Sequence, residues 1–197
     1  DRQTMNLDGC LAIITGASAG IGWELARQLG GRAKLLVLVA RRRDRLEQLR
    51  SELLRMNGEL QVEIREVDLS NLQQTMQLAD WLADKPIDFL VNNAGLGDHG
   101  SFVTADPRRV NQQIQVNALA LTVLTRAVLP RMIAQKRGAI LNVSSSAGFL
   151  PLPDLAVYAA TKAYVTSFSE AIRAETRALG ITVTALCPGP VHTEFAR

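Results

Sequence analysis

The sequence predicts an α/β fold, in which helices cover both faces of a doubly wound parallel sheet. Short apolar runs alternate with stretches of helical periodicity from one end of the 197 residues to the other. A glycine-containing turn joins the first apolar run to the first helical stretch, which is typical of a βα unit. No internal repeat or interdomain linker interrupts the alternation. We therefore expect residues 1–197 to form a single domain.

Six apolar runs have the length of strands and lie between helical stretches. Continuous apolar runs are typical of strands that are buried on both faces of a parallel sheet. The third run alternates apolar and charged residues, which indicates a position nearer the sheet edge. The six predicted strands are Leu11–Thr15, 35–39, 62–67, 89–91, 139–143 and Ile181–Leu186.

Five helices are predicted between these strands. Ser70, with Gln73 three residues later, has the pattern of a capping box that opens the third helix. Asp106 followed by Pro107 gives the next helix an N-cap and a proline at its first position. The five predicted helices cover 21–29, 42–56, a segment that begins at 70, 106–136 and 154–179.

The long helix at 106–136 is apolar on nearly every side between Ala118 and Leu129. A helix that covers a sheet needs only one apolar stripe. The second apolar face therefore favours packing against another subunit, in a homodimer or a homotetramer. The alternative is that another part of the same chain covers this face.

Composition and charge argue against several other classes of protein. Charged or polar residues interrupt every apolar run before it reaches the ~18 residues that span a bilayer, so no membrane span is expected. The polar N-terminus lacks the apolar core of a signal peptide, and Cys10 and Cys187 have no metal-binding or redox spacing. These features predict a cytoplasmic protein.

Nucleic acid and metal ions are not expected as ligands. The net charge is only +3, and the one basic cluster, 41–43 with Arg45, is not interleaved with aromatic residues. His99 and His192 are isolated in predicted loops, so no set of metal ligands is present.

The turn after the first strand reads Thr15-Gly16-Ala17-Ser18-Ala19-Gly20-Ile21-Gly22. Glycines allow positive φ and let the backbone approach a pyrophosphate, which then lies at the N-terminus of the next helix. A position between a strand and a helix is the one that a dinucleotide-binding loop requires. The alternative is a tight turn that needs glycine only for its own geometry.

The end of the second strand distinguishes NADP(H) from NAD(H). An NAD site usually has an acidic residue there, which binds the ribose 2′-hydroxyl. Ala40 occupies this position, and Arg41 and Arg42 follow it. A guanidinium suits a 2′-phosphate, so we expect NADP(H) rather than NAD(H). The alternative is that these arginines only begin a solvated helix.

Tyr158 and Lys162 lie four residues apart on the last predicted helix, and therefore on one face of it. A phenol has a pKa of about 10, and a nearby ammonium group lowers it toward the range in which an acid/base catalyst works. A solvated helix face is the alternative for an isolated pair.

Together with Asn92-Asn93-Ala94-Gly95, these motifs resemble those of the short-chain dehydrogenase/reductase family. The resemblance extends from about Leu7 to Thr193 and implies a Rossmann-type fold. Ser145 precedes Tyr158 by thirteen positions, which is the family spacing and alone selects it from 144–146. The resemblance implies a catalytic set of Asn117, Ser145, Tyr158 and Lys162. It implies cofactor binding by Gly16, Ser18, Ala19, Gly20, Ile21, Gly22, Arg41, Arg42, Asp68, Leu69, Asn92, Ala94, Gly95, Tyr158, Lys162, Pro188, Gly189, Val191 and Thr193.

The family resemblance implies hydride transfer between the nicotinamide and a carbonyl or secondary alcohol carbon. Tyr158 would donate the proton in reduction, and Ser145 would hydrogen-bond the substrate oxygen. Lys162 would lower the pKa of Tyr158 and bind the nicotinamide ribose. Asn117 would hold a water that links Lys162 to solvent.

The substrate is less defined than the chemistry. Loops at the carboxyl ends of the strands should form its pocket. Family members continue beyond the position of Arg197 into a substrate-covering segment and a seventh strand, so six strands are expected from this chain. The alternative function is a catalytically inactive or incomplete nucleotide-binding module that acts through protein contacts. The candidate pocket residues, which indicate an apolar small molecule, are Leu96, Phe149, Leu150, Leu152 and Val191.

Overall fold

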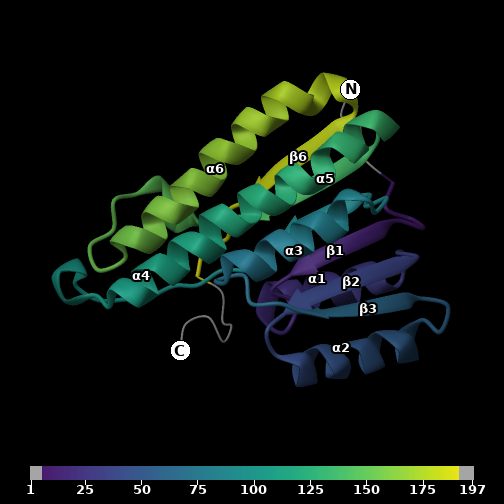
Figure 1. The fold of residues 1–197 in the computed structure, drawn as a ribbon, viewed down its shortest axis with the longest axis horizontal. Helices are drawn as coiled ribbons and strands as arrows, with labels where there is room; N and C mark the ends of the chain where they lie inside the picture. Colours follow the sequence, from purple (N-terminus) through teal and green to yellow (C-terminus); the bar gives the residue numbers. More distant parts are fainter. Residues whose placement is uncertain (1–5, 191–197) are drawn as a thin grey trace.

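The computed structural model describes residues 6–190, which form one parallel sheet with helices on both faces (Figure 1). The six strands lie in the order β3-β2-β1-β4-β5-β6, and every neighbouring pair is parallel. The predicted doubly wound fold is therefore confirmed. The strands are β1 (Leu11–Thr15), β2 (Leu35–Ala40), β3 (Gln61–Glu66), β4 (Phe89–Asn92), β5 (Gly138–Val143) and β6 (Ile181–Leu186).

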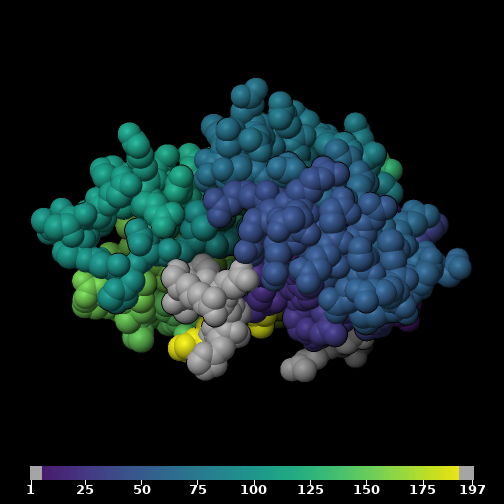
Figure 2. Space-filling model, turned by 90° about the horizontal axis from the view of Figure 1, so that it is seen from below, coloured from purple at the N-terminus to yellow at the C-terminus, as the bar shows by residue number. Residues whose placement is uncertain are grey.

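Among residues 6–190, six α-helices lie between successive strands. Two apolar clusters hold them to the sheet: α1 and α2 pack on one face, and α3, α5 and α6 pack on the other (Figure 1). In Figure 2, the α2–β3 region and the α4 region lie on opposite sides of one face of the molecule. The helices are α1 (Gly20–Gly30), α2 (Arg43–Met56), α3 (Leu72–Ala83), α4 (Pro107–Ile114), α5 (Leu121–Gln135) and α6 (Ala156–Thr176).

The N-cap of helix α3 is one residue later than the Ser70 capping box predicted. Asn71 is its N-cap, and the Asn71 side chain accepts a hydrogen bond from the Gln74 backbone N–H. Ser70 instead donates from its backbone and its hydroxyl to Asp68 Oδ1, at 3.0 and 2.8 Å. Asparagine and serine are equally good N-cap residues. Asn71 therefore takes the N-cap position of α3 in place of Ser70.

The predicted long helix is continuous in direction but changes winding in its middle. A π-helical turn, Gln115–Ala120, separates α4 from α5. By length and composition alone, the segment Pro107–Gln135 could cross a bilayer, whereas the sequence prediction expected no membrane span. A core helix has the same properties, and α5 packs against α3 and the sheet.

Candidate active site

The glycine loop lies at the edge where the carboxyl ends of all six strands meet. Gly16 and Gly20 have φ of +66° and +56°, which an L side chain rarely adopts. Helix α1 begins at Gly20, and its N-cap residue Ala19 makes no side-chain capping bond. The first N–H groups of α1 are therefore not capped by that side chain and can bind an anion.

Asn93 fixes this loop to the end of β4, a role that the sequence did not reveal. Its Nδ2 donates to the carbonyl oxygens of Thr15 (3.0 Å) and Gly16 (3.1 Å). The Thr15 hydroxyl oxygen accepts in return from the backbone N–H groups of Asn93 and Ala94, both at 3.0 Å. A Cβ at Gly22 would lie 2.5 Å from the Gly16 carbonyl oxygen, so the loop, β4 and α1 fit only around a glycine.

Asn92 was predicted to bind the cofactor, but its side chain points into the interior. Its Nδ2 donates to Asn142 Oδ1 at 2.9 Å and to the Thr125 hydroxyl at 3.1 Å. Asn142 in turn donates to Ser169, so these residues join β4 and β5 to α5 and α6. Since neighbouring strand residues face opposite sides, Asn93 rather than Asn92 faces the loop.

Lys162 is buried at the start of α6, with only 4% of its surface exposed. Its Nζ donates to the Val143 carbonyl oxygen at 2.9 Å and lies 5.6 Å from the centroid of the Tyr158 ring. Burial lowers the pKa of Lys162 to about 8, against a smaller opposing effect of Cys187. A Cβ at Gly95 would lie 3.4 Å from Nζ, so Lys162 faces the segment after β4.

The pKa of Tyr158 moves opposite to the expected direction. Burial raises it, and a hydrogen bond with the Ser145 side chain lowers it by less. Lys162 lies near the face of the phenol ring, and it is not among the causes of the shift. In this structure the phenol is therefore held protonated at neutral pH.

Only one of the three neighbouring serines reaches Tyr158. Ser144 is buried, and its hydroxyl donates to the Lys162 carbonyl oxygen at 2.8 Å. The Ser146 backbone N–H donates to the Pro188 carbonyl oxygen at 2.9 Å. Ser145 hydrogen-bonds Tyr158 and also accepts from the Ala147 N–H at 3.1 Å. The structure thus brings Ser145, Tyr158 and Lys162 together.

Asn117 lies in the π-helical turn and is 1% exposed. Its Oδ1 accepts from the Leu96 N–H, and its Nδ2 donates to the Leu96 carbonyl oxygen and to the Thr161 hydroxyl, at 2.8, 2.8 and 3.0 Å. Both amide hydrogens are used in this way. The side chain joins the segment after β4 to α6, and its role in a water relay stays a prediction.

The residues predicted to bind the adenosine part of the cofactor lie at the ends of β2 and β3. Arg42 reaches back to the Ser18 hydroxyl, at 3.3 Å from Nη2. Arg41 is exposed and lines a cavity together with Asp68. Leu69 is 7% exposed and belongs to the core, so only its backbone is available to a ligand.

Of the remaining predicted residues, some lie in the described part of the chain and others lie outside it. Pro188 and Gly189 follow β6 next to Ser146, whereas Val191 and Thr193 lie outside the described residues. Phe149 and Leu150, four and five residues after Ser145, are 63% and 61% exposed, and Leu96 and Leu152 are half-buried. Among residues 6–190 no group of three His, Cys, Asp or Glu side chains is placed to hold a metal ion.

These positions can be compared with those of known proteins. The family model for short chain dehydrogenases matches residues 11–197 of the chain. The chain belongs to the short-chain dehydrogenase family. Solved members of this family share its fold closely. A short-chain dehydrogenase from Sphingobium yanoikuyae in complex with NADPH superposes with a TM-score of 0.91 and 36% identity, over 94% of this chain and 73% of that chain.

Other short-chain dehydrogenases differ in cofactor and substrate. A bulky-bulky ketone specific alcohol dehydrogenase from Comamonas testosteroni gives a TM-score of 0.90 at 33% identity, over 95% of this chain and 74% of that one. A member from Burkholderia phymatum, solved in complex with NAD, gives a TM-score of 0.87 at 29% identity, over 98% of this chain and 70% of that chain. A Bos taurus very-long-chain 3-oxoacyl-CoA reductase is 35% identical over 94% of this chain, which spans 61% of that protein.

Proposed function

We propose that this short-chain dehydrogenase transfers a hydride between NADP(H) and a carbonyl or secondary alcohol carbon, with Tyr158 as the acid/base. One observation carries the proposal: the Ser145 side chain hydrogen-bonds Tyr158 beside the buried ammonium group of Lys162. Three groups of suitable chemistry thus meet at the carboxyl edge of the sheet, where ligands bind in open α/β folds.

The glycine loop fits a dinucleotide. A Cβ at Gly16 would lie 2.8 Å from Ala94 Cα, so the loop packs against the segment after β4 only with glycine at this position. The start of α1, where the N-cap side chain makes no bond, would bind the pyrophosphate. When bound, the nicotinamide supplies or accepts the hydride, and the protein supplies orientation and electrostatics.

The proton chemistry follows from the environment of Tyr158. Its raised pKa keeps the phenol protonated at neutral pH, as a proton donor to a developing alkoxide requires. Ser145, bonded to the same phenol, is placed to hold the substrate oxygen where negative charge develops. Lys162 contributes a positive charge on the ring side of Tyr158 in the pH range below about 8.

The preference for NADP(H) is supported by the end of β2. Ala40 stands where an NAD site has its acidic residue, Arg41 and Arg42 follow it, and Arg42 is bonded to Ser18 of the glycine loop. A guanidinium next to the loop favours a 2′-phosphate over a hydroxyl. The NADPH-bound relative from Sphingobium supports this choice. Because the relative from Burkholderia binds NAD, the affinities for NADPH and NADH are the quantities that test it.

We also propose an apolar ketone as the substrate and a homo-oligomer as the assembly. Phe149 and Leu150 expose large apolar side chains just after Ser145. The relatives that act on bulky ketones and on 3-oxoacyl-CoA support the same class. Ile114, at 46% exposure on α4, is an apolar residue that a second subunit could cover.

The test is reduction of a panel of aliphatic and aryl ketones, followed through NADPH absorbance, in wild-type protein and in Tyr158→Phe. We expect turnover by the wild type and a loss of at least about 10²-fold in the variant. NADPH affinity should stay within a few-fold. Undiminished turnover by Tyr158→Phe would refute the acid/base assignment.

A further inference from the structure

A cavity of about 680 Å³ lies where the carboxyl ends of β2 and β3 meet α3. It contains Arg41 and Asp68, which are proposed here for the adenosine end of the cofactor. It also contains residues to which no role has been given, among them Arg65 and Trp81. The cavity is lined by Arg41, Arg65, Glu66, Val67, Asp68, Gln74, Gln77, Leu78 and Trp81.

Arg65 and Arg41 reach this cavity from the same face of the sheet. Val39 pairs with Arg65 across β2 and β3, and Arg41 lies two positions beyond Val39. Val39 belongs to the cluster that packs under α3, so Arg65, its neighbour in the sheet, is on the same side. Arg41 follows the last residue of β2 and lines the same cavity as Arg65.

The guanidinium of Arg65 is held in a fixed position. Its central carbon lies 4.0 Å from the centroid of the Trp81 ring, and one of its terminal nitrogens pairs with Glu63. Its Nε is buried and has no hydrogen-bond partner within residues 6–190. A stacked and paired guanidinium loses little freedom when it binds a ligand, because it is already ordered.

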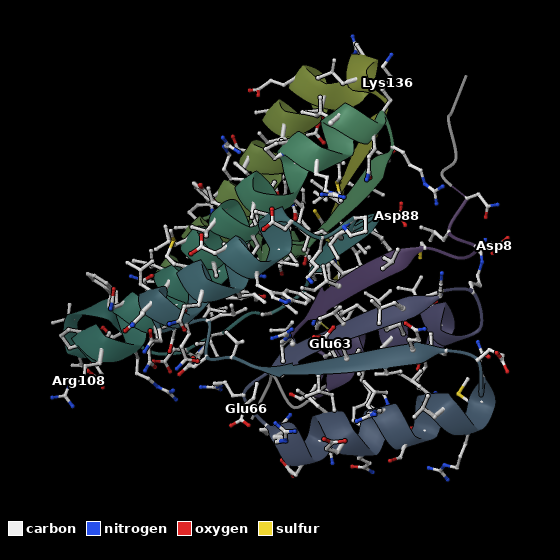
Figure 3. The ribbon with its side chains drawn as sticks, turned by 45° about the vertical axis from the view of Figure 1, so that its right-hand side comes forward. Asp8, Glu63, Glu66, Asp88, Arg108 and Lys136 are labelled. Atoms are coloured by element: carbon white, nitrogen blue, oxygen red, sulfur yellow. The ribbon has the colours of Figure 1, made fainter. Side chains whose placement is uncertain are left out.

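The carboxylates near the cavity have other partners. Asp68 Oδ1 accepts two hydrogen bonds from Ser70. Glu66 lies 4.0 Å from Arg43 of α2, and Figure 3 shows Glu66 at the end of β3 that is close to α2. Within the described part of the chain, no carboxylate is within ion-pair distance of Arg41. The lining therefore carries two guanidinium groups and two carboxylates, and Arg41 is the guanidinium with no carboxylate partner among residues 6–190.

We propose that Arg65, positioned by Trp81 and Glu63, binds the 2′-phosphate of NADP(H) together with Arg41 and so helps to select NADP(H) over NAD(H). This inference rests on the proposed function and adds a residue from β3 to the arginines that follow β2. Arg42 is bonded to Ser18 of the glycine loop, and Arg65 adds a further guanidinium that lines the same cavity as Arg41. A guanidinium group can hold a phosphate through two parallel charge-assisted hydrogen bonds.

The test compares nucleotide affinities of wild-type protein, Arg65→Met and Arg65→Gln by fluorescence titration with NADPH and with NADH. Methionine keeps an apolar stem against Trp81, and glutamine is a second variant in case one of them does not fold. We expect about tenfold weaker NADPH binding and NADH binding within twofold, since a charge-assisted bond is worth about 1.5 kcal/mol or more. Competition by 2′-AMP should weaken in parallel, while competition by 5′-AMP should not.

Lys85→Gln is the matched control. The Lys85 ammonium also lies over Trp81, at 5.0 Å, but Lys85 does not line the cavity, so neither affinity should change. Equal loss of NADPH and NADH in the Arg65 variants, or no loss of either, would overturn the inference while the proposed function stands. Wild-type protein that binds neither nucleotide would overturn both.

Discussion

The ammonium nitrogen of Lys162 lies 5.6 Å from the centroid of the Tyr158 ring and donates a 2.9 Å hydrogen bond to the Val143 carbonyl oxygen. The lysine is therefore anchored to the end of β5, and it faces the ring rather than pairing with a carboxylate. Burial of both groups disfavours their charged forms, because it raises the pKa of the phenol and lowers that of the ammonium. The first two predictions follow from this arrangement.

Replacing Lys162 with methionine should stabilise the protein at neutral pH while abolishing turnover. The pKa of Lys162 falls from 10.5 to about 8 on folding, so the buried charge costs about 3 kcal/mol below pH 8. Between about pH 8 and 10.5 the unfolded state binds the extra proton, and wild-type stability rises with pH. Urea unfolding should therefore show the largest gain for Lys162→Met near pH 7 and almost none near pH 10.5.

Exposed Lys34→Met serves as the control for that experiment, and its stability should not change with pH relative to wild type. A variant Lys162→Met that is less stable than wild type at pH 7 would contradict the prediction. It would mean that the hydrogen bond to Val143 outweighs the cost of burying the charge.

Replacing Ser145 with alanine should move the pH dependence of alcohol oxidation to higher pH. Oxidation needs the phenolate form of Tyr158, and the hydrogen bond from Ser145 lowers the pKa of that phenol. Without this bond the pKa rises further, and kcat/KM should reach its plateau at a higher pH. The maximal rate should also fall about 10²-fold, because a donor to the substrate oxygen is lost. In Ser146→Ala, whose altered side chain is exposed, the profile should stay in place.

Replacing Gly22 with alanine should disrupt the cofactor loop. The new Cβ would lie 2.5 Å from the Gly16 carbonyl oxygen and would overlap Asn93 Nδ2. We expect a loss of about 1–3 kcal/mol in the free energy of unfolding and of most NADPH affinity, measured by urea unfolding and fluorescence titration. Gly31→Ala is the matched control, since it has no atom within 4 Å of its Cβ and a φ of −81°. Equal effects of the two substitutions would rule out the steric explanation.

Replacing Asn93 with alanine should weaken NADPH binding more than it weakens the fold. The Asn93 amide bonds the Thr15 and Gly16 carbonyl oxygens, and loss of both bonds frees the loop while the strands stay paired. We expect about tenfold lower affinity in a titration and a stability loss of about 1–2 kcal/mol. Asn111→Ala on the exposed side of α4 should change neither quantity. Unaltered NADPH affinity in Asn93→Ala would show that the glycine loop binds the cofactor without the two Asn93 hydrogen bonds.

Most of the fold could be predicted because its signals are local. Each strand is a continuous apolar run, and each predicted run matches a strand to within one residue at either end. The π-helical turn at Gln115–Ala120 could not be predicted, since its residues continue the same apolar helical pattern. The N-cap of α3 was misplaced because Ser70 and Asn71 are equally good capping residues.

The sequence by itself determined the parallel α/β fold and the family, and it supplied the residues proposed for the chemistry. Residue types, order and spacing were enough for these, because they depend on local pattern. Only the tertiary structure decided that Asn93 and not Asn92 faces the glycine loop, and that the pKa of Tyr158 is raised rather than lowered. Both depend on which side a residue faces and how deeply neighbouring elements bury it, and packing between distant segments sets these properties.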